Sequence, residues 1–425
     1  MGEHTFDATV VLEGLRELPG GRELLDLARG RTDVELVGGA VRDLLLGRTP
    51  RELDVVVAGR ESSPGPALLF ARALAARVDA LAETNEHERF GTALVVWDGA
   101  QVDVAGARRE RYAAPGALPE VAPATLDDDL LRRDFTVNAI AVTLDTTRPG
   151  EVRAPPGALA DLRAGRLRVL HDASFIDDPT RLLRLARYSA RLGFAIEAHT
   201  AELASRALTA HALDTISGTR IGAELRLALD EPDATGALAA MDELGLLTAL
   251  HPRLRLDRSA IERSLALLPD DARPDLLIMA ALTLPLTLRA DEPRTEIVAL
   301  LDRLEFTAPD RDRIAAAATA VSRLTGALPD ATRPSQLRTA VTGVPPEGVA
   351  LAGGVSESSA GPARRWFTEL RDIRLLITGE DLLAAGIAEG PEVGRRLDAT
   401  LDRKLDGDLA DGRDAELAAA LEARV

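Results

Sequence analysis

Residues 36–57, LVGGAVRDLLLGRTPRELDVVV, constrain the fold more than any other stretch of this chain. A short apolar and β-branched run at residues 34–37 predicts a strand, and Gly38 and Gly39 break it. Residues 41–46 then predict a helix, which the following Arg-Thr-Pro sequence ends because proline cannot continue it. Glycines before a helix let backbone N–H groups approach an anion, so this turn is typical of a phosphate site.

Three charged side chains in the same stretch suit nucleotide chemistry. Arg42, in the first turn of the predicted helix, offers a planar fork of donors to a triphosphate. Glu52 and Asp54 lead into an apolar strand, and because side chains alternate along a strand, both are expected to project from one face. Paired carboxylates suit Mg²⁺, which can activate an attacking hydroxyl and stabilise a departing pyrophosphate. The alternative is an ordinary strand edge with two solvated acids.

Further segments follow the motif order of one family. They are residues 89–92 (RFGT), 131–142 (LRRDFTVNAIAV) and 177–194 (DDPTRLLRLARYSARLGF). Together with GGAVRD and the acid-x-acid strand, they resemble the class II tRNA nucleotidyltransferases and bacterial poly(A) polymerases over roughly residues 31–230. The resemblance implies template-independent transfer of nucleotides from CTP or ATP to the 3′ end of tRNA, with Mg²⁺ as cofactor. The family usually has Asp at the first metal position, where this chain has Glu52.

Within this resemblance, three carboxylates form the catalytic set. Glu52 and Asp54 hold Mg²⁺, and Asp103 on a neighbouring strand acts on the metal or on the attacking hydroxyl. Asp103 follows an Asp98-Gly99 dipeptide, which predicts a two-residue hairpin. An exposed hairpin acid is the alternative for Asp103.

Several further residues are expected to bind the nucleotide. By resemblance, the triphosphate contacts are Gly38, Gly39, Arg42, Arg133, Arg184 and Arg187. Asp178 and Arg181 are three residues apart, so we expect them side by side on one helix face, where carboxylate and guanidinium can imitate the edge of a base. The family commonly has Glu where this chain has Asp177. A salt-bridged surface helix is the alternative.

Polar residues around the second motif are expected to support the site. We expect Arg132 to form an ion pair with a neighbour, and Asp134 and Asn138 to hold the local backbone, since polar groups that enter a core need partners. Residues 108–129 are rich in Ala, Pro and Gly and resemble the family's mobile loop beside the nucleotide. Their prolines rule out a long regular element.

Composition bounds the class of protein. The chain has 425 residues and is 46% hydrophobic, which is enough for real cores. No apolar run approaches a membrane span and the N-terminus lacks a charged-then-apolar signal, so we expect a cytoplasmic protein with no membrane partner. The absence of cysteine excludes disulfides and zinc-thiolate sites. The net charge of −17 weighs against nucleic-acid binding at first sight, but such binding depends on a local basic stripe.

We predict an α+β chain, in which a nucleotidyltransferase head with a small mixed β-sheet is followed by an all-α neck, body and tail. The predicted parts are a leading helical segment (residues 1–30), a catalytic head (31–145) with strands near Val34, Asp54, Leu94, Val102 and Val137, a linker and helical neck that recognises the base (146–230), and a helical body and tail (231–425). By resemblance, the body and tail hold the elbow of tRNA. No oligomeric state is predicted.

Other functions share some of these features. A poly(A) polymerase, or an enzyme that adds only CC or only the last A, has the same chemistry. A catalytically weak RNA-binding protein is consistent with Glu52 and the acidic charge. A nucleotidyltransferase of small molecules is disfavoured by the long helical region.

Overall fold

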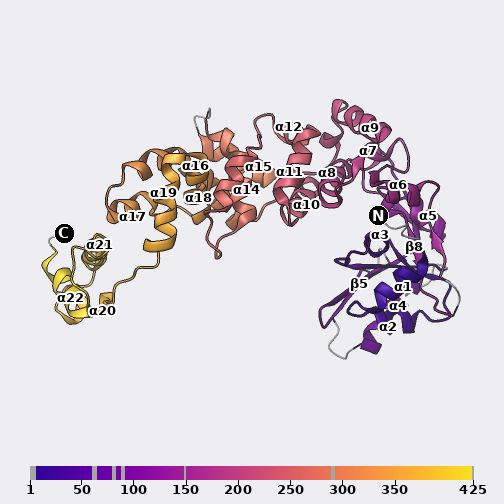
Figure 1. Ribbon diagram of the computed structural model, residues 1–425, viewed down its shortest axis with the longest axis horizontal. Coiled ribbons are helices and arrows are strands. Elements are labelled where there is room, and N and C mark those ends of the chain that lie inside the picture. Colours follow the sequence, from indigo (N-terminus) through magenta and orange to yellow (C-terminus); the bar gives the residue numbers. More distant parts are fainter. Residues whose placement is uncertain are drawn as a thin grey trace. The chain divides into compact units, whose positions relative to one another are not determined.

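The computed structural model describes residues 6–59, 65–78, 83–87, 91–147, 150–288 and 292–423. The chain forms two compact units, Met1–Ser217 and Gly218–Val425, called here the first and the second unit. In the described residues, every strand lies in the first unit, and the second unit is built from helices (Figure 1). The predicted α+β class is confirmed.

The first unit is organised by a seven-stranded sheet in the order β3-β4-β5-β2-β1-β8-β9, as far as the chain is described. Its strands, in that order, are Glu83–His87, Thr92–Trp97, Ala100–Gly106, Leu53–Val57, Val34–Val37, Ala141–Thr143 and Val152–Arg153. β2 and β5 run parallel, with Asp54 opposite Asp103, whereas the other neighbouring strands run antiparallel. The sheet is therefore mixed, as predicted, and its one parallel pair brings two acidic residues together.

Helices cover the sheet. Those of the N-terminal part are α1 (Ala8–Arg16), α2 (Gly21–Leu27), α3 (Gly39–Leu45) and α4 (Pro66–Val78). α4 packs against β2, β4 and β5, while Leu130 of α5 (Leu126–Leu131) packs with Val37 and Val56. Asp54 lies two residues before Val56 and therefore on the same face of the sheet. This face carries the candidate site.

Two sequence expectations differ from the structure. The strand predicted near Val137 is wrong, because Thr136–Asn138 form a short 3₁₀ turn (η2) and the strand follows at β8. Asp134 accepts hydrogen bonds from the backbone N–H of Phe135 and from the side chain of Asn138, which gives this segment a local alternative to the sheet. The predicted linker also contains β9 and a helix, α6 (Ala158–Ala164).

The rest of the first unit consists of a hairpin and the neck. Residues 108–129 contain the hairpin strands β6 (Arg108–Arg111) and β7 (Glu120–Pro123), followed by the start of α5, and so no long element, as the prolines predict. The neck elements are β10 (Arg166–Leu167), α7 (Ser174–Asp177), α8 (Thr180–Leu192), β11 (Ala195–Ile196), α9 (Ala198–Thr209) and η3 (Ala212–Thr215).

Two apolar clusters of the second unit lie wholly among the described residues. Its helical segments are α10 (Gly218–Leu229), α11 (Ala234–Glu243), α12 (Leu246–Leu250), α13 (Arg258–Leu265), α14 (Pro274–Thr283), η4 (Leu284–Leu288), α15 (Pro293–Arg303), α16 (Ala308–Asp330), α17 (Pro334–Val341), α18 (Pro346–Val355), α19 (Glu357–Arg365), η5 (Trp366–Leu370), α20 (Gly379–Ala384), α21 (Pro391–Leu405) and α22 (Arg413–Glu422). The larger cluster joins α13, α14 and α16–α19 with η5 and α21. A smaller one gathers around Ile377, Leu382 and Ala420.

Close helix packing defines the centre of the second unit. A Cβ atom at Gly348 of α18 would lie 3.0 Å from the Cα atom of Ala317 in α16, so only glycine allows this approach. Beside it, the fully buried Glu347 accepts two hydrogen bonds of 2.8 Å from Arg313. Among the helices that the structure describes, none is long and apolar enough to cross a membrane.

Candidate active site

The turn between β1 and α3 is the centre of the site. Gly38 has a φ of +71°, and a Cβ atom there would lie 2.7 Å from Nη1 of Arg133 and 3.5 Å from Oδ2 of Asp54. A side chain at this position would suffer both backbone strain and a steric clash, so the turn requires glycine. The glycine turn, a carboxylate and a guanidinium group, predicted from three separate segments, thus meet at one point.

Three carboxylates lie close to one another at β2 and β5. Asp54 is partly buried on β2 opposite Asp103 of β5, and Glu52 is exposed just before β2. Burial, followed by the charge of Glu52, raises the pKa of Asp54 to about 6, and Asp103 adds to this effect while Arg133 opposes it. The three acids are therefore close enough to repel one another, as their predicted roles require.

The chemistry of these carboxylates fits a divalent cation. They supply hard oxygen donors, and a cation would offset the repulsion that, in addition to burial, raises the pKa of Asp54. In the part of the chain that the structure describes, no three acidic, histidine or cysteine side chains are gathered tightly enough to hold a metal ion as they stand.

Arg133 is held at the turn by a buried acid. Its Nη2 donates to Oδ2 of Asp129 at 3.0 Å, and Asp129 is only 1% exposed. The Nε atom of Arg133 is buried without a hydrogen-bond partner among the described residues. Arg132, in contrast, donates to Asp129 and Glu110, both at 2.9 Å, which confirms the ion pair expected for it. Adjacent arginines thus have different surroundings, and Arg133 is the one that lies against Gly38.

Asp134 organises a second group of polar contacts. It accepts hydrogen bonds from the N–H of Phe135 at 2.8 Å, from Nδ2 of Asn138 at 2.9 Å and from Nε of Arg184 at 2.9 Å. Burial alone would raise the pKa of Asp134, but the charge of Arg184 and the hydrogen bonds outweigh it and lower the pKa to about 2. The expectation that Asp134 and Asn138 hold local structure is confirmed.

Arg42 lies beneath the glycine turn. It is 2% exposed, its Nε donates to Oδ1 of Asp43 at 2.8 Å, and its Nη1 donates to Oδ1 of Asn138. A Cβ atom at Gly39 would lie 3.5 Å from Nη2 of Arg42. These contacts favour a supporting role for Arg42. Direct contact of Arg42 and Gly39 with a triphosphate stays a prediction.

The expectation that Asp178 and Arg181 share a helix face is wrong. Asp178 lies between α7 and α8 with extended backbone, because a residue before proline, here Pro179, is disfavoured in the helical region. Its side chain caps the next helix, accepting hydrogen bonds from the N–H of Thr180 at 3.1 Å and its hydroxyl at 2.6 Å. Arg181 donates to the carbonyl of Arg132 at 2.7 Å. The two residues remain adjacent, since the N–H of Arg181 donates to the Asp178 carbonyl at 3.1 Å.

Two motif residues, Arg89 and Phe90, lie outside the described residues. Gly91 and Thr92, which complete the motif, lead into β4.

The sequence matches two described families and several curated proteins. Residues 34–168 match the family described as "Poly A polymerase head domain", and residues 193–257 match "Probable RNA and SrmB- binding site of polymerase A". The chain is 36% identical over 376 residues to the CC-adding tRNA nucleotidyltransferase of Deinococcus radiodurans, covering 86% of this chain and 83% of that protein. The chain belongs to the tRNA nucleotidyltransferase family.

Two other relatives of the tRNA nucleotidyltransferase family differ in length and activity. The A-adding tRNA nucleotidyltransferase of Geobacter sulfurreducens is 34% identical over 423 residues, which cover 94% of this chain but 46% of that protein. This chain spans about half the length of the first curated relatives that it matches. The structure of the Thermotoga maritima CCA-adding enzyme complexed with tRNA_CCA superposes with a TM-score of 0.76 at 28% identity, covering 98% of this chain and 99% of that one.

Two residues of the site were not predicted from the sequence. Asp129 holds both Arg132 and Arg133, and its only signal is its place in an acidic run just before them. The Tyr188 ring has the guanidinium carbons of Arg42, Arg184 and Arg187 within 5.4, 5.4 and 4.9 Å of its centroid. An aromatic residue between arginines on one helix is the signal that could have identified it.

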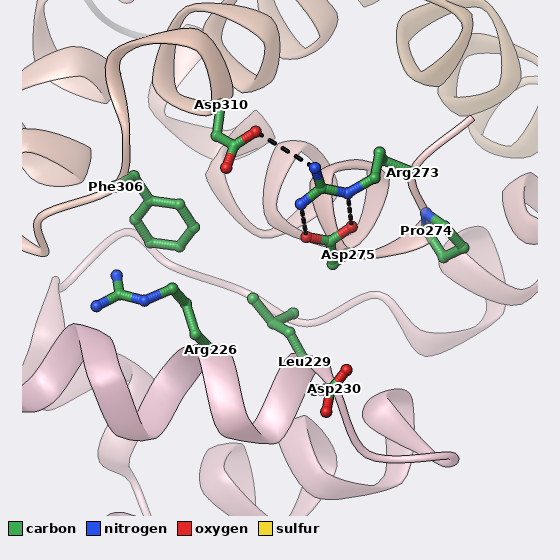
Figure 2. A pocket seen from close by; sticks show the side chains of 8 residues that line it. All are labelled: Arg226, Leu229, Asp230, Arg273, Pro274, Asp275, Phe306 and Asp310. Carbon is green, nitrogen blue, oxygen red and sulfur yellow. Dashed lines mark hydrogen bonds and ion pairs between the residues drawn. The ribbon is translucent and has the colours of Figure 1, made fainter. Parts of the chain in front are cut away.

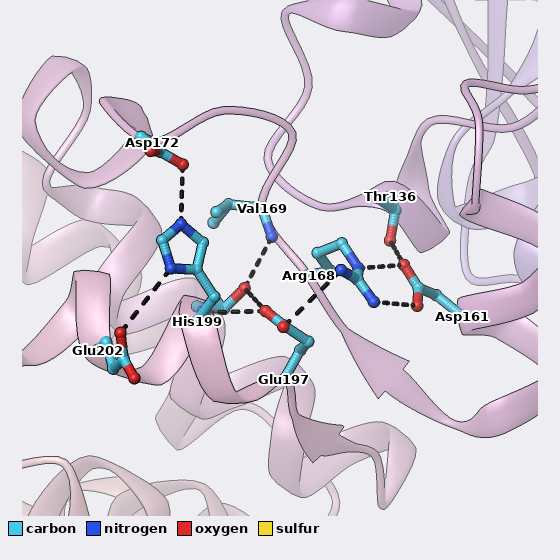
Figure 3. Close-up of polar contacts among 9 residues, drawn as sticks. Thr136, Asp161, Arg168, Val169, Asp172, Glu197, His199 and Glu202 are labelled. Carbon is cyan, nitrogen blue, oxygen red and sulfur yellow. Dashed lines mark hydrogen bonds and ion pairs between the residues drawn. The ribbon is translucent and has the colours of Figure 1, made fainter.

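A chain of polar contacts ties the head motif to the neck (Figure 3). The hydroxyl of Thr136 donates to Asp161 at 2.9 Å, and Arg168 donates to both oxygens of Asp161 at 2.9 and 3.2 Å. Arg168 also lies 3.7 Å from Glu197, which accepts the N–H of Thr200 at 2.9 Å and so caps α9. The motif that carries Arg133 is thereby anchored to the helices that follow it.

A separate cavity of about 470 Å³ lies within the second unit (Figure 2). Arg226 lies over the Phe306 ring at 5.4 Å from its centroid, and Arg273 pairs with Asp275 at 2.6 Å and with Asp310 at 3.5 Å. Both arginines of this cavity therefore have partners within the second unit.

Proposed function

We propose that this chain is a template-independent RNA nucleotidyltransferase, which adds CMP, AMP or both from CTP and ATP to the 3′ end of tRNA and releases pyrophosphate. The observation that carries the proposal is the meeting of three groups at one turn, where a Cβ atom on Gly38 would lie 2.7 Å from Arg133 and 3.5 Å from Asp54. A phosphate can approach the bare glycine backbone there, with a guanidinium group and a carboxylate beside it.

The reaction is attack of the primer 3′-hydroxyl on the α-phosphate, with departure of pyrophosphate. Glu52 and Asp54 would hold Mg²⁺, which when bound favours the deprotonated hydroxyl and stabilises charge on the leaving group. Asp103 lies opposite Asp54 in the parallel pair, and we assign it the role of orienting the attacking hydroxyl. Arg133 presents Nη1 at the glycine turn and binds the triphosphate, while Asp129 fixes its orientation.

Base selection is assigned to the start of α8. Asp178 and Arg181 are adjacent there, and each is fixed by contacts with neighbours: Asp178 by Thr180, and Arg181 by Ser174 at 2.7 Å and the Arg132 carbonyl at 2.7 Å. Fixed donors and acceptors can discriminate between bases without a template, because a mismatched base leaves a polar group without its hydrogen bond. Arg184 and Arg187, one and two turns further along α8, are proposed to continue toward the phosphates.

The second unit is proposed to bind the tRNA beyond its 3′ end. The matched RNA-binding family reaches residue 257, well into this unit. The relatives named above are CC-adding, A-adding and CCA-adding, so all three products are candidates for this chain. A poly(A) polymerase is the remaining candidate with the same chemistry.

Primer extension tests the proposal. The protein is incubated with Mg²⁺ and three tRNA transcripts that end before CCA, after C or after CC, with CTP, ATP or both, and the products are resolved at single-nucleotide length. Addition that stops at CCA, CC or the final A supports the proposal and names the form, whereas a long A tail identifies a poly(A) polymerase. ATP binding with no addition to any transcript would overturn it in favour of an RNA-binding protein.

A further inference from the structure

The aromatic ring of Tyr188 lies at the centre of an arginine cluster. The guanidinium carbons of Arg42, Arg184 and Arg187 are 5.4, 5.4 and 4.9 Å from the ring centroid, and Nη2 of Arg184 donates to the Tyr188 hydroxyl at 3.3 Å. Arg42 comes from α3, whereas the other two arginines belong to α8, as does Tyr188 itself. One side chain thus contacts cations from two elements that are far apart in sequence.

The ring itself is held in place. Tyr188 meets Phe135 edge to face, with centroids 6.0 Å apart and an interplanar angle of 84°. Phe135 is fully buried, and its N–H donates to Asp134, which in turn accepts the hydrogen bond from Arg184. The ring therefore contacts the segment that carries Asp134, in addition to its neighbours on α8.

An aromatic ring can stabilise several positive charges that lie close together. Three guanidinium groups around one point repel one another, and the negative π-faces of an aromatic ring attract each of them. Acidic residues further reduce the repulsion between the arginines, since Asp43 pairs with Arg42 at 2.8 Å and Asp134 pairs with Arg184 at 2.7 Å. An aliphatic side chain of similar size would fill the space without this attraction.

The cluster adjoins the candidate active site. Nη2 of Arg42 would lie 3.5 Å from a Cβ atom on Gly39 of the glycine turn. The charge of Arg184 is among those that act on the pKa of Asp54, although burial and Glu52 have larger effects. The cations around Tyr188 are therefore close to the place where phosphate is proposed to bind.

We propose that Tyr188 is a positioning residue for the nucleotide triphosphate. The Tyr188 ring holds Arg184 and Arg187 in place and, through Arg42, joins α8 to the glycine turn. The inference rests on the proposed function and deepens it. Tyr188 does not touch the reacting atoms. Removing its ring should therefore weaken nucleotide binding more than it lowers the rate of reaction in the bound complex. The hydroxyl is secondary, because its hydrogen bond from Arg184 is long.

Three substitutions of Tyr188 test the inference. Tyr188→Phe keeps the ring, Tyr188→Leu removes it, and Tyr188→Met replaces it with a longer apolar chain in case the Leu variant does not fold. The KM for ATP and CTP and the kcat are measured at saturating tRNA, equilibrium dialysis gives the Kd for ATP, and thermal melting checks folding. Phe6→Leu is the matched control, because Arg163 lies over the Phe6 ring at 4.8 Å in the same unit but outside the site.

We expect the Leu and Met variants to raise the nucleotide KM and Kd about tenfold with a kcat within about threefold of wild type, and the Phe variant and the Phe6→Leu control to stay within about twofold. Unchanged nucleotide KM and Kd in folded Leu or Met variants would overturn the inference, as would equal losses in the Phe and Leu variants. If the wild-type protein adds no nucleotide, the proposed function fails, and the ATP Kd series still tests Tyr188.

Discussion

Asp54 is the single side chain on which the proposed chemistry depends most. It lies at the glycine turn, opposite Asp103, and its carboxylate is the one whose pKa is raised by burial and by Glu52. We expect Asp54→Asn to reduce nucleotide addition by roughly 10²–10³-fold, because it removes the negative charge that is proposed to hold a divalent cation. Primer extension under single-turnover conditions measures the effect.

A matched control for Asp54→Asn is available on the same sheet. Asp98 forms the β4–β5 turn with a φ of 37°, a conformation that asparagine tolerates, so Asp98→Asn should leave the rate within about twofold. Glu52→Asp restores the residue usual in the family and is expected to keep activity, since the oxygen donors remain. Equal rates for Asp54→Asn and wild type would contradict the metal-binding role.

Asp134 makes stability depend on pH in a defined window. Its pKa is lowered from 3.8 to about 2, so it stabilises the fold above pH 4 and this stabilisation is lost as the pH falls toward 2. We expect Asp134→Asn to lower the free energy of unfolding by roughly 2 kcal/mol at neutral pH, and the difference from wild type to shrink between pH 4 and pH 2. Urea titrations across this range measure it.

Asp270 is exposed, has no side-chain partner among the described residues, and provides the control for this pH series. Asp270→Asn should follow the wild-type profile at every pH. A constant difference between Asp134→Asn and wild type from pH 7 to pH 2.5 would show that the substitution acts through packing rather than through the titration of Asp134.

At the scale of elements, the β6–β7 hairpin is tied to the neck at its loop. The N–H of Gly116 donates to the carbonyl of Ile176 at 3.1 Å, and a Cβ atom on Gly116 would lie 2.2 Å from Oγ1 of Thr215. Tyr112 donates to Glu110 at 3.0 Å, and burial raises the pKa of its hydroxyl. The loop is therefore packed in this structure rather than free beside the site.

Gly116→Ala tests this packing. The φ of +68° strains any L-residue by roughly 1–2 kcal/mol, and the contact with Thr215 adds roughly 1–3 kcal/mol of overpacking. Gly157→Ala is the matched control, because its φ is +87° but nothing lies within 4 Å. We expect faster hydrogen exchange in residues 108–129 for Gly116→Ala only. The same exchange rates in both variants would contradict the docking of the loop.

At the scale of the whole molecule, each unit carries one of the two tryptophans. Trp97 packs against Gly20 in the first unit, where a Cβ atom on Gly20 would lie 2.4 Å from its ring, and Trp366 packs against the larger cluster of the second unit. Fluorescence of Trp97→Phe and Trp366→Phe variants therefore reports the unfolding of each unit separately. We expect two distinct urea transitions, since two compact units need not unfold together.

Ligands sharpen this prediction. ATP with Mg²⁺ at about 100 times its Kd should stabilise the transition reported by Trp97 by roughly 2.7 kcal/mol and leave the Trp366 transition unchanged. tRNA is expected to stabilise both, because its proposed contacts extend into the second unit. Coincident transitions with identical ATP shifts would contradict independent unfolding of the units.

Local sequence predicted the elements that are decided by neighbouring residues. The two glycines predicted the β1–α3 turn, and Asp98-Gly99 predicted the β4–β5 hairpin, where both residues have positive φ. Prolines correctly limited residues 108–129 to short elements. The predicted boundaries between head, neck, body and tail stay a prediction, because the structure divides the chain only into two units. The misplaced strand near Val137 shows the limit, because a side-chain hydrogen bond from Asn138 to Asp134 outweighed an apolar pattern.

What each charged residue does was decided by the tertiary structure. Arg42 meets Asn138 from 96 residues away, and Arg184 meets Asp134 from 50 residues away, so no local pattern identifies these partners. Resemblance placed Asp103 beside Asp54, but their register exists only in the assembled sheet. Backbone preferences act over a few residues, so local sequence predicts them. A buried charge needs an opposite charge nearby, and only the tertiary structure determines which residue supplies it.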